Sequence, residues 1–176
     1  MIIFTIGHST HPLDAFIGLL TENSVQQLVD VRTIPRSRHN PQFNADSLPG
    51  SLKQAGIGYV HRGELGGLRR ARKDSPNMGW RNASFRGYAD YMLIPEFNRG
   101  LGELIDAAGK ESVAIMCAEA VPWRCHRSLI ADALIVRGIE VRHIMGPDKW
   151  QNHKLTPFAQ VDGTRITYPF ALESGS

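Results

Sequence analysis

Residues 113–127, VAIMCAEAVPWRCHR, run directly into residues 128–135, SLIADALI, and this stretch decides the fold. Residues 113–116 form a short continuous apolar run, which is typical of a strand buried on both faces of a parallel sheet. Residues 126–136 carry apolar side chains at helical spacing. The pattern therefore predicts a strand, a loop and a helix, with the loop at a strand's carboxyl end, where open α/β sheets bind ligands.

Apolar runs and amphipathic stretches alternate along the rest of the chain. Strands are predicted at residues 2–6, 27–32, 57–61, 113–117 and 139–144, and helices between them, including one that begins near Pro12 and one that begins near Pro95. This order predicts a single α/β domain over residues 1–145, doubly wound, with a mostly parallel sheet of about five strands and helices on both faces. Residues 146–176 are predicted to be a polar extension packed on that domain, with a weak hairpin signal.

Composition sets the broad class. The 176 residues are 42% hydrophobic and 21% charged, which is ordinary for a globular domain. No apolar run reaches the roughly 18 residues of a membrane span, and the start of the chain lacks the features of a signal peptide. We expect a cytoplasmic protein with no membrane partner, in which the two cysteines are thiols.

Five residues are candidates for catalysis, and each also has a structural interpretation. Cys125 lies where a helix begins, beside His126 and two arginines, so we expect it to be partly exposed, with a lowered pKa. Cys117 ends a buried strand and is either reactive or a small core residue. His126, Glu119 and His8 are candidate proton carriers, but Glu119 also suits an ion pair and His8 also suits a helix cap.

A second group of residues is predicted to bind an anionic substrate. In a doubly wound sheet, the loops after the first, second and fourth strands can converge on one crevice. Asp30 and Arg32 end the second strand, where a structural ion pair is the alternative interpretation. The predicted substrate-binding residues are Ser9, Asp30, Arg32, Arg36, Arg69, Arg70 and Arg127.

Residues 61–86 contain seven basic and two acidic residues, a net charge of +5, and many glycines without apolar periodicity. A loop of this kind is a lid, a binding loop or a solvated surface, and nearby aromatic residues suit nucleotide contact. A metal site from Cys117, Cys125, His126 and His8 is not predicted, because no closely spaced ligand pair is present. No cofactor is indicated by the sequence.

Five ordered motifs resemble the family known as "domain of unknown function 488". They are TIGHST at residues 5–10, the Asp30-Val-Arg-x-x-Pro35-x-Ser37 segment, the turn at residues 65–67, FRGYADYM at residues 85–92, and the Cys117 to Arg127 loop. The resemblance covers residues 1 to about 145. It implies little about activity, since the family is uncharacterised and some members are labelled as related to DNA repair. It does imply that the motif positions belong to one composite site.

Three functions fit these residues. The first is an enzyme that acts on a nucleotide or nucleic-acid-derived anionic substrate through a Cys/His/Arg site. The second is a noncatalytic nucleic-acid-binding or DNA-repair accessory module, whose phosphate contacts must weaken as salt rises. The third is a thiol-redox or sulfur-transfer protein. The expected partner is therefore an anionic small molecule or a nucleic acid; the reaction and the oligomeric state stay open.

Overall fold

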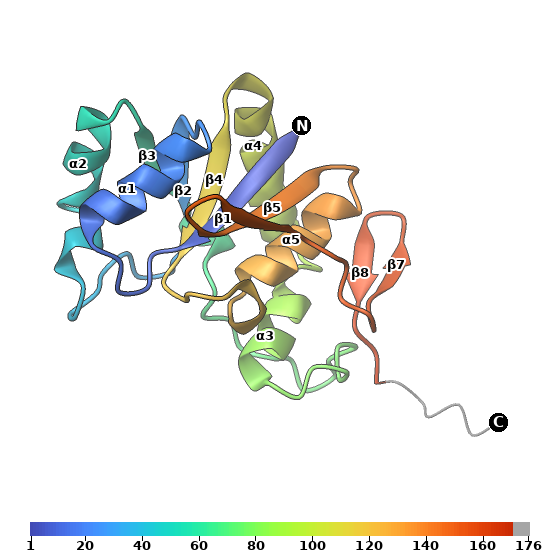
Figure 1. Ribbon diagram of the computed structural model, residues 1–176. Helices are drawn as coiled ribbons and strands as arrows, with labels where there is room; N and C mark the ends of the chain where they lie inside the picture. The colour runs from blue at the N-terminus through green and yellow to red at the C-terminus, as the bar shows by residue number, and fades with distance from the viewer. Residues whose placement is uncertain (171–176) are drawn as a thin grey trace.

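A six-stranded sheet lies at the centre of the computed structural model, which describes residues 1–170 (Figure 1). The strands are β1 Ile2–Gly7, β2 Gln27–Asp30, β3 Gly58–His61, β4 Val113–Cys117, β5 Glu140–Gly146 and β6 Lys149–Asn152. Their order is β3-β2-β4-β1-β5-β6, and every pair is parallel except β5 with β6. The predicted mostly parallel sheet is confirmed, with one strand more than expected, since β6 comes from the predicted extension.

Helices cover both faces of the sheet, as predicted. The helices are α1 Leu13–Glu22, α2 Leu48–Gln54, α3 Ala83–Tyr91, α4 Pro95–Lys110 and α5 Arg127–Ile135. Alternate residues of β4 enter two separate cores: Ile115 packs with α3, α4 and α5, whereas Met116 packs with α1 and α2. This burial on both faces explains the continuous apolar run of β4.

The topology places a crevice above β1 and β4. These neighbouring strands pair from Ile3 with Val113 to Gly7 with Cys117. The chain leaves β1 for α1 on one face of the sheet and leaves β4 for α5 on the other. Loops that diverge in this way open a space at the carboxyl ends of the strands, where doubly wound proteins bind ligands.

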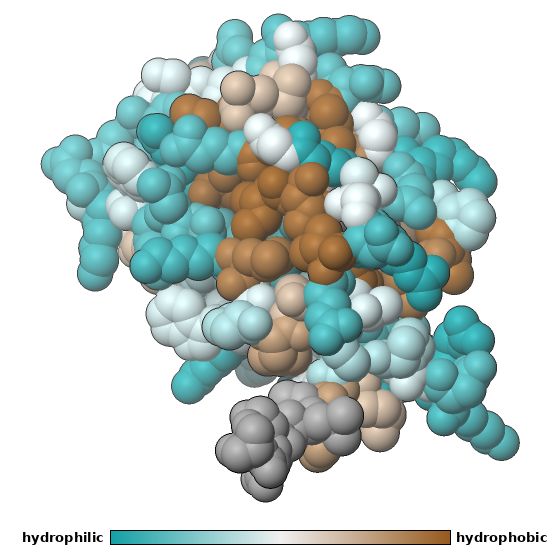
Figure 2. Space-filling model, turned by 90° about the vertical axis from the view of Figure 1, so that its right-hand side faces the viewer, coloured by the Kyte–Doolittle hydropathy of each residue, from teal (hydrophilic) through white to brown (hydrophobic). Residues whose placement is uncertain are grey.

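The C-terminal part adds β6 to the sheet edge and then forms a small hairpin. Strands β7 Gln160–Asp162 and β8 Arg165–Thr167 pair antiparallel, with Gly163 in the left-handed conformation at φ 63°. Residues 171–176 of the predicted extension lie outside the described residues. Figure 2 looks at the side that carries β7 and β8 in Figure 1, where hydrophobic side chains gather in one central area surrounded by hydrophilic ones.

The basic segment at residues 63–84 is largely irregular, as predicted, apart from one turn of 3-10 helix at Gly63–Leu65 and the start of α3 at Ala83. It is nevertheless anchored to α3 through Asp90. The Asp90 carboxylate accepts hydrogen bonds from Ser75 Oγ at 2.6 Å, from Asn77 Nδ2 at 2.7 Å and from the Arg72 backbone N–H at 2.8 Å. Within residues 1–170, no helix is long and apolar enough to cross a membrane.

Candidate functional site

A pocket of about 390 Å³ opens at the carboxyl ends of the central strands. Its walls come from four segments that are far apart in the sequence. The lining includes residues 32–34 and Arg36 after β2, residues 67–68, residues 84–85 at the start of α3, and residues 117–119 and 124–126 after β4. We call it the thiol pocket, because both cysteines line it.

The thiol pocket gathers half of the predicted site residues. Six of the twelve line it: Cys117, Glu119, Cys125, His126, Arg32 and Arg36. Six others are not in its lining: His8, Ser9, Asp30, Arg69, Arg70 and Arg127. Arg124, which was not among the predicted site residues, lines it as well, and it is exposed. The sequence could have indicated Arg124, because it lies between Glu119 and Cys125, which were both predicted site residues.

The two cysteines are free, buried thiols, and the prediction of a partly exposed Cys125 is wrong, since only 4% of it is exposed. Burial and the neighbouring Cys117 raise the pKa of Cys125 well above its usual value. Burial also disfavours the thiolate of Cys117, but the neighbouring Cys125 thiol and the charge of Arg127 outweigh it and lower the pKa of Cys117. The expected thiolate therefore belongs to Cys117.

His126 is held in one orientation beside Cys125. Its Nε2 lies 2.9 Å from the Val31 carbonyl, which only accepts, so Nε2 carries the proton. The unprotonated Nδ1 then faces the Cys125 sulfur at 3.5 Å. Burial lowers the pKa of His126 to about 4, so the ring is neutral near pH 7. A close backbone approach supports this arrangement: a Cβ on Gly67 would lie 2.8 Å from Nδ1.

Arg127 lies behind the loop rather than in the pocket lining. It is fully buried, and its guanidinium donates to Thr5 Oγ1 at 2.8 Å and to the carbonyls of Glu119 at 3.0 Å and Ala120 at 3.1 Å. This geometry corrects the prediction that Arg127 holds a substrate anion: the side chain is fully buried outside the pocket lining and fixes the Cys117 loop, and only its Nε lacks a partner within residues 1–170. Its charge nevertheless favours the Cys117 thiolate.

A buried hydrogen-bonded chain leads away from Arg127. Thr5 Oγ1 lies 2.6 Å from His143 Nδ1, His143 Nε2 lies 2.8 Å from His153 Nδ1, and His153 Nε2 lies 2.7 Å from Asp132. With both imidazoles neutral, every N–H in this chain has an acceptor. The chain thus joins a buried cation to a buried carboxylate. Sequence reasoning missed it because its members lie on four separate elements.

His8, Asp30 and Arg32 form a second cluster beside the pocket. Arg32 donates to both carboxylate oxygens of Asp30, at 2.9 and 2.7 Å, and Tyr59 O–H donates to the same carboxylate at 2.6 Å. Arg32 Nη1 lies 3.4 Å from His8 Nε2, and the His8 ring stacks on Phe43. Burial lowers the pKa of His8. The structural ion pair of Asp30 with Arg32 is therefore present, and Arg32 is already neutralised.

The other predicted anion ligands lie apart from the thiol pocket. Ser9 follows β1 with φ 45°, and its N–H donates to the Ala118 carbonyl. Arg69 donates to the carbonyls of Gly66 and Gly63 and stacks on the Tyr91 ring at 3.7 Å, so it fixes the basic segment. Arg70 is exposed.

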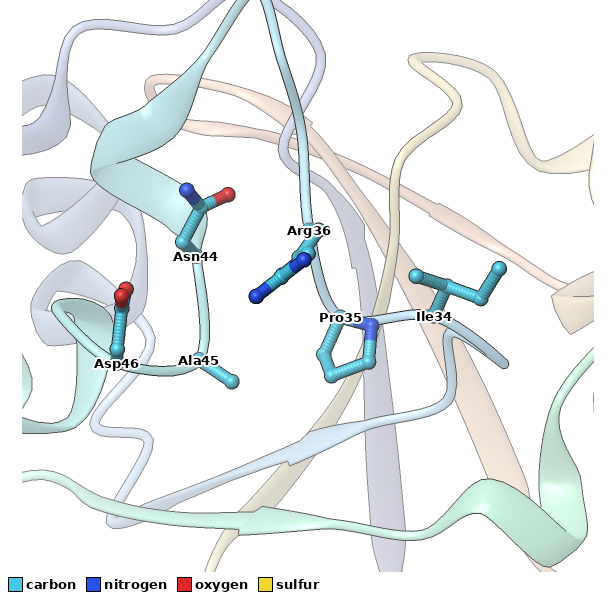
Figure 3. A pocket seen from close by; sticks show the side chains of 6 residues that line it. All are labelled: Ile34, Pro35, Arg36, Asn44, Ala45 and Asp46. Carbon is cyan, nitrogen blue, oxygen red and sulfur yellow. The ribbon is translucent and has the colours of Figure 1, made fainter.

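A neighbouring hollow of about 360 Å³ shares Arg36 with the thiol pocket. Figure 3 shows the Arg36 side chain between the segment at residues 34–36 and the segment at residues 44–46. Within residues 1–170, neither Arg36 nor Arg124 has a carboxylate partner. The described residues contain no group of three or more His, Cys, Asp or Glu side chains placed to hold a metal ion.

Fold and site together define a doubly wound α/β protein with a buried thiol pair at the carboxyl edge of its sheet. A family model described as "Domain of unknown function DUF488" matches residues 12–134, so the chain belongs to that family. The matched range contains β2 to α5, including the Cys117 loop, whereas the motif at residues 7–10 precedes it. Comparisons with curated proteins and with solved structures give no match.

Proposed function

We propose that this protein is an enzyme that acts on a nucleotide or nucleic-acid-derived anionic substrate, with Cys117 as its nucleophile. One observation carries the proposal: a thiol with a lowered pKa lines the same pocket as two exposed guanidinium groups, those of Arg36 and Arg124, that lack carboxylate partners within residues 1–170. An anion held there by arginine lies beside a nucleophile.

Each residue of the thiol pocket has a separate role. Arg36 and Arg124 bind the anionic group, and the Cys117 thiolate donates its electron pair to an electrophilic atom of the same substrate. The leaving group departs with the bonding pair and takes up a proton from solvent. Cys125 keeps its own proton and stabilises the Cys117 thiolate, because the pKa of Cys125 is raised by burial and by Cys117. Neutral His126 presents its unprotonated Nδ1 to the Cys125 thiol as a hydrogen-bond acceptor.

Alkylation of each cysteine by iodoacetamide, followed by mass spectrometry across a pH series, tests the proposal. We expect Cys117 to react at lower pH than an ordinary thiol, and inorganic phosphate or a nucleoside monophosphate to slow its labelling. The Arg36→Gln/Arg124→Gln double variant should lose this protection. The matched control is Arg70→Gln/Arg81→Gln, which removes two exposed arginines outside the pocket lining. Labelling of Cys117 that no anion slows would overturn the proposal.

A thiol-redox function is the second candidate, favoured by the mutual effect of the two cysteines on their pKa values. It requires an oxidant, for which oxidised glutathione is a suitable probe. Attack of the Cys117 thiolate on that disulfide releases one reduced glutathione, and attack by Cys125 on the mixed disulfide then releases the second. An intramolecular disulfide in the product supports this candidate, whereas a stable mixed disulfide or an unchanged protein contradicts it.

The noncatalytic nucleic-acid module has weaker support. It relied on the positive charge of residues 61–86, where four of the seven basic side chains already make hydrogen bonds within the protein: Arg62, Arg69, Arg72 and Arg86. Arg70, Lys73 and Arg81 are exposed. A steep loss of oligonucleotide affinity with rising salt would favour this module over the enzyme.

A further inference from the structure

A second pocket, of about 350 Å³, lies on the other side of the turn that carries Arg124 and Cys125. We call it the ring pocket, because Trp80, Trp123 and Phe158 line it. Its volume is in the range of small-molecule sites. Its remaining lining includes the two histidines of the buried chain, His143 and His153, and polar residues of β6 and the segment that follows it.

The two pockets share a wall. Residues 122–123 face the ring pocket, whereas residues 124–126 face the thiol pocket, so one short 3-10 turn, Pro122–Arg124, separates them. The linings of the two pockets also meet at a pair of aromatic rings. Phe85 of the thiol pocket contacts Trp80 of the ring pocket, with ring centroids 5.1 Å apart. Trp80 in turn contacts Phe158 at 4.8 Å. The two pockets are therefore neighbours, divided by a single short turn of the chain.

The side chains of the ring pocket suit a flat, hydrogen-bonding ring. Trp123 is 59% exposed, which leaves its indole face free for stacking. The amides of Gln151 and Asn152 are exposed and make no side-chain hydrogen bond within residues 1–170, so both their donors and their acceptors are available. Lys154 adds a positive charge to the same lining. Stacking faces next to free amides are the groups that recognise a nucleobase.

We infer that the ring pocket binds the base of a nucleoside phosphate whose phosphate lies in the thiol pocket, with Trp123 as the stacking residue. The inference rests on the proposed function for the phosphate, but the ring pocket itself is independent of it. The charge and shape of a nucleoside phosphate match the two pockets. Arg36 and Arg124 bind its phosphate in the thiol pocket, and the aromatic walls of the ring pocket bind its planar base. A phosphorylated sugar without a base would fill only the first pocket.

Isothermal titration calorimetry with four probes tests the inference: adenosine 5′-monophosphate, uridine 5′-monophosphate, ribose 5-phosphate and adenosine. The test variant is Trp123→Ala, and the control is Trp150→Ala, which removes another exposed indole that does not line the ring pocket. Both indoles are exposed, so neither change opens the core. We expect Trp123→Ala to weaken nucleotide binding on the order of 10- to 100-fold. Ribose 5-phosphate binding and the Trp150→Ala variant should be unaffected.

The outcomes separate this inference from the proposed function. If the nucleotides and ribose 5-phosphate bind equally well and Trp123→Ala acts like Trp150→Ala, the base site is wrong while the anion site stands. If adenosine binds with the same dependence on Trp123 and the phosphate adds nothing, the base site stands and the proposed anion site fails. If none of the four probes binds, both are overturned.

Discussion

At the scale of single residues, the two cysteines differ through their surroundings rather than through their place in the sequence. Cys125 follows arginine at the start of a helix, which favours a thiolate. The structure buries it against Cys117 and orients the neutral His126 beside it, so the proton stays on Cys125. The pKa of Cys117 is instead lowered by the neighbouring Cys125 thiol and by the charge of Arg127, so Cys117 becomes the better nucleophile.

Replacing Cys125 with alanine should therefore make Cys117 less reactive. The change removes the neighbouring thiol that lowers the pKa of Cys117, and a hydrogen-bonding group beside a charged one is worth about 1.5–3 kcal/mol. We expect the alkylation rate of Cys117 at pH 7 to fall on the order of 10-fold. Ser128→Ala, which removes a hydroxyl bonded to the Cys125 carbonyl, is the control and should change the rate little. An unchanged or faster reaction in Cys125→Ala would contradict this view of the pair.

At the scale of elements, Gly7 allows the end of β1 and the loop after β4 to cross. A Cβ at Gly7 would lie 1.7 Å from the Glu119 carbonyl oxygen and 3.0 Å from Arg127 Nη2. Neither backbone can move freely, because Arg127 also holds that carbonyl. The glycine in the TIGHST motif is thus required by this crossing.

Gly7→Ala should destabilise the protein by about 1–3 kcal/mol or more, the usual cost of overpacking. It should also disturb the Cys117 loop, which alkylation of Cys117 would report. Gly18→Ala is a matched control, since Gly18 lies in α1 and a Cβ there would have nothing within 4 Å, and alanine is expected to stabilise the helix by roughly 0.5–1 kcal/mol. Urea unfolding of both variants measures the difference. Equal stability of Gly7→Ala and wild type would refute the crossing argument.

The sequence predicted elements better than it predicted their contacts. Apolar periodicity and the glycines and prolines that end each element are local signals, so β1 to β5 and the helices on both faces follow from them, whereas the hairpin in the C-terminal extension gave only a weak signal. The strand β6 was missed because all four of its residues are exposed, which leaves no apolar alternation to recognise. Arg69 and Arg127 were assigned to an anion because the sequence does not reveal the backbone carbonyls that they bind.

At the scale of the whole molecule, two buried charges of α5 are joined through side chains from other elements. Arg127 and Asp132 are both fully buried and are linked through Thr5, His143 and His153. Asp132 also accepts hydrogen bonds from Thr156 and Tyr168. Because these residues come from β1, α5, β5 and the segments after β6 and β8, the network forms only when the whole sheet is assembled. Local patterns could therefore not predict it.

Because two of its buried histidines have lowered pKa values, we expect the protein to be less stable in acid. Burial lowers the pKa of His143 to about 3, and burial lowers the pKa of His126 to about 4. In the unfolded chain, both pKa values rise to about 6.5, so below that pH the unfolded state binds more protons than the folded state. The stabilisation is complete above about pH 6.5 and is lost as the pH falls towards the folded values. At pH 5, each of these two histidines should lower the free energy of unfolding by about 2 kcal/mol.

The measurement is the free energy of unfolding in urea at pH 7 and at pH 5 for wild type, His143→Gln and His39→Gln. Glutamine keeps a donor and an acceptor at position 143 but cannot titrate. We expect the loss of stability between the two pH values to be about 2 kcal/mol smaller in His143→Gln than in wild type. His39 is exposed, so His39→Gln should lose as much as wild type. An equal loss in all three proteins would mean that His143 is not held neutral between Thr5 and His153.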